Sequence, residues 1–213
     1  MATDNEQDLK LSLTEPFNFF MSKIYDLPYW LKEAIEETIR VNINKLTINT
    51  YVYSFGLPVF QLIVPQLTFL GTKELETKSG KHDIKLYKFL RQVSEGRNLT
   101  EITLNNGWTL AQTAHIYSVC YSKEYLTHVL DVKVPVDAAY IAGDIKLGEY
   151  LSKLGLVNVE QIEQALIEQK DDPNNTLIGK IFTRMGLLKD EDIIHILKIK
   201  EGADQKVSLP RIK

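Results

Sequence analysis

The sequence predicts an α+β N-terminal domain followed by a small all-α domain built from a tandem repeat. Three observations support this prediction. Apolar residues recur at helical spacing over much of the chain, an uncharged stretch at 51–71 is rich in β-branched and aromatic residues, and a short pattern near the end occurs twice. A chain of 213 residues is long enough for one to two domains with a sizeable core.

The composition, 44% hydrophobic and 25% charged, is that of an ordinary globular protein. The net charge of -3 argues against a nucleic-acid binder, which usually carries a basic surplus. The single cysteine, Cys120, excludes an internal disulfide, and its helical context predicts a buried small hydrophobe in a reducing compartment. The polar, acidic N-terminus lacks the features of a secretory signal, so we expect a cytoplasmic protein.

Residues 1–14 are expected to form a disordered tail, and the α+β domain is expected over 15–134. Two helices should open this domain, beginning near Thr14 and Asp26, each with a proline in its first turn. The second helix carries an apolar stripe at helical spacing, which consists of Trp30, Leu31, Ala34, Ile35 and Ile39.

The uncharged stretch at 51–71, YVYSFGLPVFQLIVPQLTFLG, is long enough to raise the question of a membrane span. A glycine, two prolines and two glutamines interrupt it, and β-branched and aromatic residues dominate. It therefore predicts two short buried strands, near 48–54 and 59–70, separated by a Gly-Leu-Pro bend, and no membrane span.

Three helices are predicted next, at 84–96, 98–107 and 109–130, and glycines mark the ends of the first two. Their arrangement is similar to a winged-helix or helix-turn-helix unit, so a transcriptional regulator is one alternative. DNA readers need cationic contacts to phosphate, whereas the third helix has no Lys or Arg before Lys123. Protein packing is the preferred interpretation, and DNA is not expected as a partner. The first helix has an apolar face made of Leu86, Phe89, Leu90 and Val93.

The stretch VKVPVDAAYIAGD at 132–144, with Pro135 at its centre, predicts an extended connector, and the domain boundary is placed at 135–143. The repeat domain is expected over 144–202, and 203–213 is expected to be a tail.

The pattern KLGEYLSKLGLV, which begins at Lys146, returns 31 residues later as LIGKIFTRMGLL, which begins at Leu177. Each copy predicts a helix, 146–154 or 177–185, that ends at a left-handed structural glycine. A second helix should then start near Asn158 or at Lys189–Asp190. The terminating glycines are Gly155 and Gly186, and the inward faces of the second helices are expected to be Ile162, Ala165, Leu166 and Ile193, Ile196, Leu197.

Gly148 and Gly179 lie at equivalent positions within the first helices, where a glycine costs up to about 1 kcal/mol of helix stability. Because this cost is accepted twice, the two glycines suggest that the other repeat or a ligand approaches the helix backbone closely at these positions. The alternative explanation for the glycines is helix-helix packing alone.

The tandem pattern [Arg/Lys]-Leu-Gly-x2-Leu-x3-Gly-Leu-x5-Leu-x3-Leu-x2-Gln over 146–200 resembles the MshEN-type N-terminal domain of type II secretion and type IV pilus assembly ATPases. The resemblance implies a domain that docks on a partner of the secretion machine or binds cyclic di-GMP. In that family, binders use the leading Arg, the backbone near the first Gly, the apolar positions and the closing Gln. The ligand-binding residues carried over are Lys146, Leu147, Gly148, Gln169, Ile178, Gly179 and Arg184.

The nucleotide-binding part of this pattern is altered in three places. Lys146 stands where the family has Arg, Leu177 replaces the second Arg, and Lys200 replaces the second closing Gln. Because the planar fork of Arg makes bidentate contacts that Lys and Leu cannot make, these changes favour protein docking over cyclic di-GMP binding.

The family's ATPase domain carries a P-loop of the form Gly-x4-Gly-Lys-[Ser/Thr], and this motif is absent here. Around Gly80-Lys81, Leu75 stands at the position of the first Gly and His82 at that of the Ser or Thr. The four histidines and Cys120 show no zinc spacing. We therefore expect no enzyme, no catalytic residue, no metal and no cofactor.

The expected function is that of a bacterial cytoplasmic adaptor or regulator, with a cyclic di-GMP receptor as the alternative and a winged-helix regulator as a weaker one.

Overall fold

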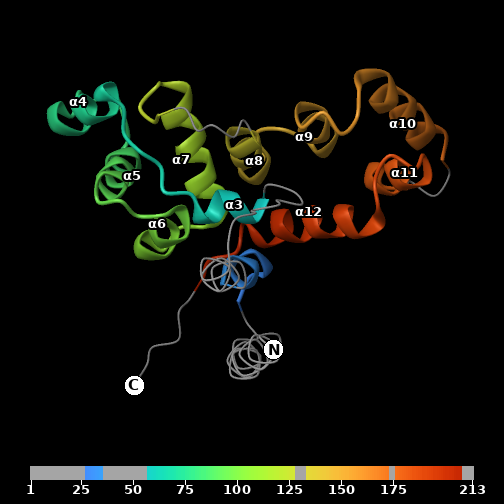
Figure 1. Cartoon of the computed structure of the whole chain (residues 1–213), viewed down its shortest axis with the longest axis horizontal. Coiled ribbons are helices and arrows are strands. Elements are labelled where there is room, and N and C mark those ends of the chain that lie inside the picture. The colour runs from blue at the N-terminus through green and yellow to red at the C-terminus, as the bar shows by residue number, and fades with distance from the viewer. Residues whose placement is uncertain (1–26, 36–56, 128–132, 173–175, 208–213) are drawn as a thin grey trace, which may run out of the picture.

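The computed structural model describes residues 27–35, 57–127, 133–172 and 176–207 (Figure 1). Helices make up 68% of the described residues, strand makes up 1%, and these residues form no sheet. The prediction of an α+β N-terminal domain is therefore wrong, since the described part of the chain is nearly all helical.

The predicted strand at 59–70 does not form: its two ends belong to short helices, α3 (Leu57–Leu62) and α4 (Phe69–Thr77), and the residues between them are not helical. Thr68 caps α4, because its side-chain oxygen accepts a hydrogen bond from the amide of Gly71 at 3.1 Å. The other predicted strand, 48–54, lies outside the described residues.

Extended pairing is limited, in the described residues, to one isolated antiparallel bridge between Leu67 and Leu126. Thr68 donates its amide to the carbonyl of Tyr125 at 3.0 Å, and Thr127 donates to that of Gln66 at 2.9 Å. This bridge joins the start of α4 to the segment after α7.

Three helices occupy the predicted three-helix unit, α5 (Ile84–Ser94), α6 (Leu99–Asn106) and α7 (Leu110–Ser122), but the third ends at Ser122 and does not continue to residue 130 as predicted. Asn98 and Thr109 form capping boxes at the starts of α6 and α7. Gly107 ends α6 with a left-handed φ of 61°. The predicted apolar face of α5 is buried. Helix α7, the segment that would read DNA, is instead a core helix whose buried residues are Leu110, Ala111, Thr113, Ala114, Ile116, Tyr117 and Cys120.

The segment predicted as an extended connector is helix α8 (Lys133–Ala142). Pro135 lies in its first turn, where the missing proline N–H removes no helical hydrogen bond. Helix α8 packs against α7 and α3, and also against α9. Buried Asp137 accepts a hydrogen bond at Oδ1 from the hydroxyl of Tyr150 at 2.8 Å, which fixes α8 to α9.

The repeat forms two helical hairpins, and its predicted helices are confirmed. The terminating glycines have left-handed φ angles, +71° at Gly155 and +70° at Gly186. Asn158 forms a capping box at the start of the second helix of the first hairpin. The four helices are α9 (Leu147–Lys153), α10 (Val159–Asp171), α11 (Ile178–Arg184) and α12 (Asp190–Gly202).

Helix α12 runs back from the repeats to the rest of the molecule (Figure 1). At its end, the carbonyl of Ala203 accepts a hydrogen bond from the amide of Ala111 at 3.0 Å. Residues 29–35 are helical and lie beside α12, with the Tyr29 hydroxyl 3.1 Å from Nδ1 of His195. Buried residues of α5 to α12 and of 29–35 belong to one hydrophobic cluster.

The outcome for the predicted N-terminal helices is mixed. Trp30, Leu31 and Ala34 are buried as predicted, and Ile35 packs against the core. The predicted helix start at Asp26, the stripe residue Ile39 and the whole of the first predicted helix lie outside the described residues. No helix within the described ranges has the length and apolar character needed to cross a membrane.

Candidate functional site

The starts of the two motifs, 146–148 and 177–179, lie next to one another. Lys146 and Leu177 occupy the N-cap positions of α9 and α11, and neither side chain caps its helix. Both side chains are exposed. A Cβ atom built on Gly179 would lie 3.6 Å from Cδ2 of Leu147. The fold thus brings Leu147 of the first motif close to Gly179 of the second, although the two motifs begin 31 residues apart in the sequence.

The two helical glycines lie against the second helix of their own repeat. A Cβ on Gly148 would lie 3.6 Å from Cγ2 of Ile162, and a Cβ on Gly179 would lie 2.8 Å from Cγ2 of Ile193. Since Ile162 and Ile193 are themselves equivalent under the repeat, the same packing contact occurs twice. The main contacts are therefore those of helix-helix packing within each repeat, which was the alternative, and only the contact at Gly179 is closer than an ordinary van der Waals contact.

The closing residues of the motifs form hydrogen bonds within the protein. Gln169 donates from Nε2 to the carbonyl of Thr176 at 3.0 Å, which ties the end of α10 to the segment before α11. Lys200 donates from Nζ to the carbonyl of Ile141 at 2.8 Å, which ties α12 to the end of α8. Burial lowers the pKa of Lys200 from its usual value. In each repeat, the side chain at the predicted nucleotide position thus has a structural contact.

Arg184, the remaining member of the predicted ligand set, joins the second repeat to the first. Its Nη2 lies 2.7 Å from Oε1 of Glu168 and 3.5 Å from Oδ2 of Asp172. The guanidinium is therefore already compensated by two carboxylates. A phosphate group would have to compete with both carboxylates for this cation.

The predicted inward faces of the second helices are only partly correct. Leu166 and Leu197, which are equivalent under the repeat, are 49% and 38% exposed. Helical periodicity predicted the buried face of each helix correctly, but it assigned to that face one leucine in each repeat that is exposed. The residues that are buried or packed against the core, as predicted, are Ile162, Ala165, Ile193 and Ile196.

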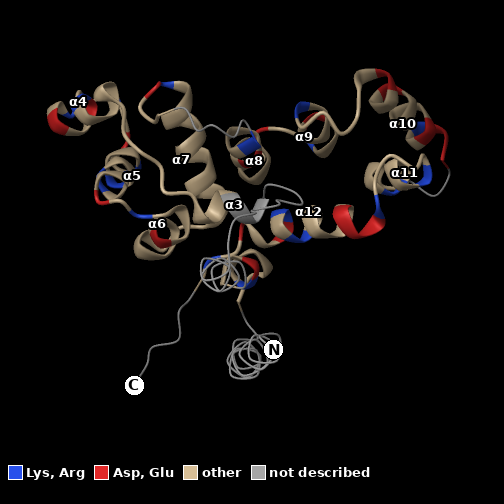
Figure 2. Cartoon of the chain, viewed as in Figure 1, with Lys and Arg blue, Asp and Glu red and all other residues tan. Residues whose placement is uncertain are grey.

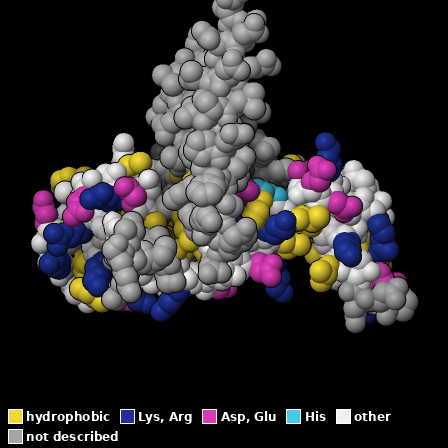
Figure 3. All heavy atoms as spheres, turned by 90° about the horizontal axis from the view of Figure 1, so that it is seen from below, with side chains coloured by type: hydrophobic (Ala, Val, Ile, Leu, Met, Phe, Trp, Pro, Cys, Tyr) yellow, Lys and Arg dark blue, Asp and Glu magenta, His cyan; other side chains and the backbone are white. Residues whose placement is uncertain are grey.

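Four apolar residues on the second helices of the two repeats are exposed, and we call this set the apolar face: Leu166 and Ile167 on α10, and Ile194 and Leu197 on α12. Ile167 and Ile194 are 63% and 50% exposed. Figure 3 shows hydrophobic side chains gathered among charged ones on the part of the surface that carries the repeats. Such residues leave apolar area in water that a partner could cover.

Carboxylates lie on the same two helices as the apolar face. Helix α10 carries four acidic residues and a single lysine, Lys170, and α12 has three acidic residues in its first turn. Figure 2 shows this acidic colouring on α10 and at the start of α12. The acidic residues at the start of α12 are Asp190, Glu191 and Asp192.

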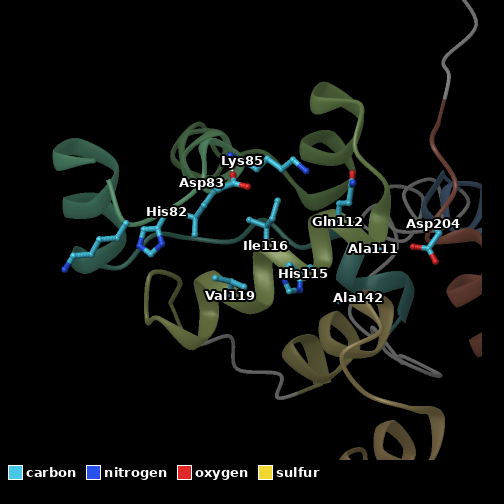
Figure 4. Close-up of a pocket in the computed structure, with 12 residues that line it drawn as sticks. His82, Asp83, Lys85, Ala111, Gln112, His115, Ile116, Val119, Ala142 and Asp204 are labelled. Carbon is cyan, nitrogen blue, oxygen red and sulfur yellow. Dashed lines mark hydrogen bonds between the residues drawn. The ribbon is translucent and has the colours of Figure 1, made fainter. Parts of the chain in front are cut away.

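A separate cavity of about 530 Å³ lies between the start of α5 and α7 (Figure 4). Its walls also include Ala142 at the end of α8 and Asp204 after α12. Apolar and ionisable residues both line it, the latter including Lys81, Asp83, Lys85 and His115. Sequence reasoning missed this cavity because its walls come from four distant segments, none of which has a distinctive pattern.

Cys120 and two histidines are among the other described side chains with nucleophilic or acid–base chemistry. Burial raises the pKa of the Cys120 thiol to about 12, so the thiolate is absent at neutral pH. His82 Nε2 lies 3.0 Å from the hydroxyl of Tyr125, and His115 Nδ1 lies 3.5 Å from Oδ1 of Asp144. Within the described ranges, no three His, Cys, Asp or Glu side chains are grouped as metal ligands.

Comparison with protein families, curated proteins and solved structures gave no match to this chain. Its function must therefore be argued from its own residues.

Proposed function

We propose that this chain is a non-enzymatic adaptor, bacterial and cytoplasmic, whose tandem repeats dock on a partner protein of a secretion, pilus or signalling system. The exposure of the apolar face is the observation that supports docking. Leu166 and Leu197 occupy the same position in the two repeats, and both side chains are partly exposed to solvent. Exposed apolar residues among charged ones are typical of protein interaction surfaces.

The charges beside the apolar face specify the chemistry of the partner. Glu163 is exposed on α10, and Asp190 and Glu191 are exposed at the start of α12. A complementary surface presents apolar side chains bordered by Lys and Arg. Because such charges mainly steer association and are screened by salt, binding should weaken as ionic strength rises.

Photo-cross-linking in cells of the source organism tests this proposal. A photoreactive amino acid replaces Ile167 on the apolar face or, as the control, Ile84, which is 68% exposed on α5. We expect position 167 to cross-link one protein that position 84 does not capture. Identical products from both positions, or none from position 167, would contradict docking through this face.

Cyclic di-GMP binding is the second candidate, because the leading residues of both motifs are neighbours in space. The contacts of Gln169 and Arg184 within the protein argue against it. Calorimetry with cyclic di-GMP distinguishes the two functions. The docking proposal predicts no saturable heat. Saturable binding that Lys146→Ala abolishes would favour the receptor instead.

A further inference from the structure

We infer that the cavity between α5 and α7 binds a small organic anion with an apolar body. This site is distinct from the apolar face, and the inference does not depend on the proposed docking function. A volume of about 530 Å³ lies within the range of roughly 300–1,000 Å³ that is typical of small-molecule sites. Ile116 and Val119 of α7 and Leu86 of α5 give the cavity an apolar wall against which such a body can pack.

The lysines at the α5 border provide the charge. Lys81 and Lys85 line the cavity, and Figure 4 shows Lys85 extending across it toward Gln112 on α7. Asp83 stands between these lysines in sequence, but its carboxylate accepts the amide hydrogen of Lys85 and caps α5. The ammonium groups of the two exposed lysines can pair with an anionic group of a ligand through charge-assisted hydrogen bonds.

At the end of the cavity away from the lysines, acidic residues lie close to other basic residues of the protein. Asp204 lies at the far end of the cavity in Figure 4. The charges of Asp204 and Asp144 both act on nearby Lys200. Asp144 also faces His115 at 3.5 Å. The anionic group of the ligand therefore belongs at the lysine border, with its apolar body directed along α7.

The cavity also lies where the N-terminal helices meet the repeats. Ala142 and Asp204, from the ends of α8 and α12, form part of its wall, and the Ala111–Ala203 backbone hydrogen bond lies beside it. A ligand that contacts both halves stabilises their present arrangement, by an amount that grows with its free concentration relative to its dissociation constant. The site thus gives a metabolite a route to influence how the repeats are held.

Amide NMR shifts of the full chain during titration test this site. The probes are phenyl phosphate and benzoate, with inorganic phosphate and benzyl alcohol as controls that lack the apolar body or the charge. We expect saturable shifts at residues 83–86 and 111–119 with the aromatic anions, and much weaker binding of both controls. The tighter of the two aromatic anions identifies whether the natural ligand carries phosphate or carboxylate.

Two variants on the same helix complete the test. Lys85→Met keeps the aliphatic stem but removes the charge, and it should weaken binding by about tenfold or more. Lys88→Met, also exposed on α5 but outside the cavity wall, should bind as the unaltered protein does. The absence of saturable shifts with both aromatic anions, shifts centred elsewhere, or equal affinities of the two variants would overturn the inference.

Discussion

Gly179 faces Ile193 so closely that a Cβ atom on the glycine would lie 2.8 Å from Cγ2 of the isoleucine. The equivalent pair of the first repeat, Gly148 and Ile162, leaves 3.6 Å for the same atom. Real Cβ atoms do not approach other carbons at the first distance, whereas the second is an ordinary van der Waals contact. The two repeats share one packing contact, but only the second repeat requires glycine for it.

Alanine substitutions should therefore have opposite effects in the two repeats. Gly179→Ala forces buried Ile193 to move and should lower the free energy of unfolding by about 1–3 kcal/mol. Gly148→Ala fits without displacement and should leave stability unchanged or raise it by up to about 1 kcal/mol. Urea denaturation measures both variants, and equal effects of the two substitutions would contradict this explanation of the glycines.

The sequence was informative where a local signal determined the structure. The left-handed glycines at 155 and 186, the capping residues Asn98 and Asn158, and the apolar face of α5 all occur where the pattern predicts them. Each depends on residues within one or two helical turns. The sequence could not show which residues of α10 and α12 are covered by neighbouring helices. Periodicity indicates which face of a helix is apolar, but it does not identify the residues that pack against that face.

The strand and connector predictions failed because proline and β-branched residues were given too much weight. Thr68 is a helix N-cap, and this signal was present in the sequence before α4. Pro135 suggests the centre of an extended segment, although proline is also compatible with the first turn of a helix such as α8. The buried partner of Asp137, Tyr150, belongs to another helix, and no local pattern indicates that contact.

Hydrogen exchange should show that α8 is a stable helix rather than a connector. Val134, Ala138, Tyr140 and Ile141 are buried, and the carbonyl of Ile141 accepts the hydrogen bond from Lys200. We expect the amides of residues 138–142 to exchange as slowly as those of α7, because both helices belong to the same core. Exchange within seconds at neutral pH over 138–142 would support the extended connector instead.

The buried thiol of Cys120 should couple stability to alkaline pH. Its pKa is raised from 9.0 to about 12 by burial, so between these values the unfolded chain loses the thiol proton while the folded chain retains it. The contribution of the thiol to stability is complete below pH 9 and is lost as the pH rises toward 12. At pH 8, a thiol reagent should react promptly in concentrated urea but slowly with the folded protein. Prompt stoichiometric reaction of the folded protein would show that the thiol is accessible.

The affinity of the cross-linked partner for variants of the apolar face tests the docking proposal most directly. Leu166→Glu and Leu197→Glu each place a charge in the surface that the partner covers, and Ile84→Glu places the same charge on exposed α5. Because central apolar contacts contribute about 2 kcal/mol or more, we predict dissociation constants at least roughly 30-fold higher for the two face variants. Ile84→Glu should bind as the unaltered protein does, and all three should keep its melting temperature. Equal affinities for all three variants would contradict the account.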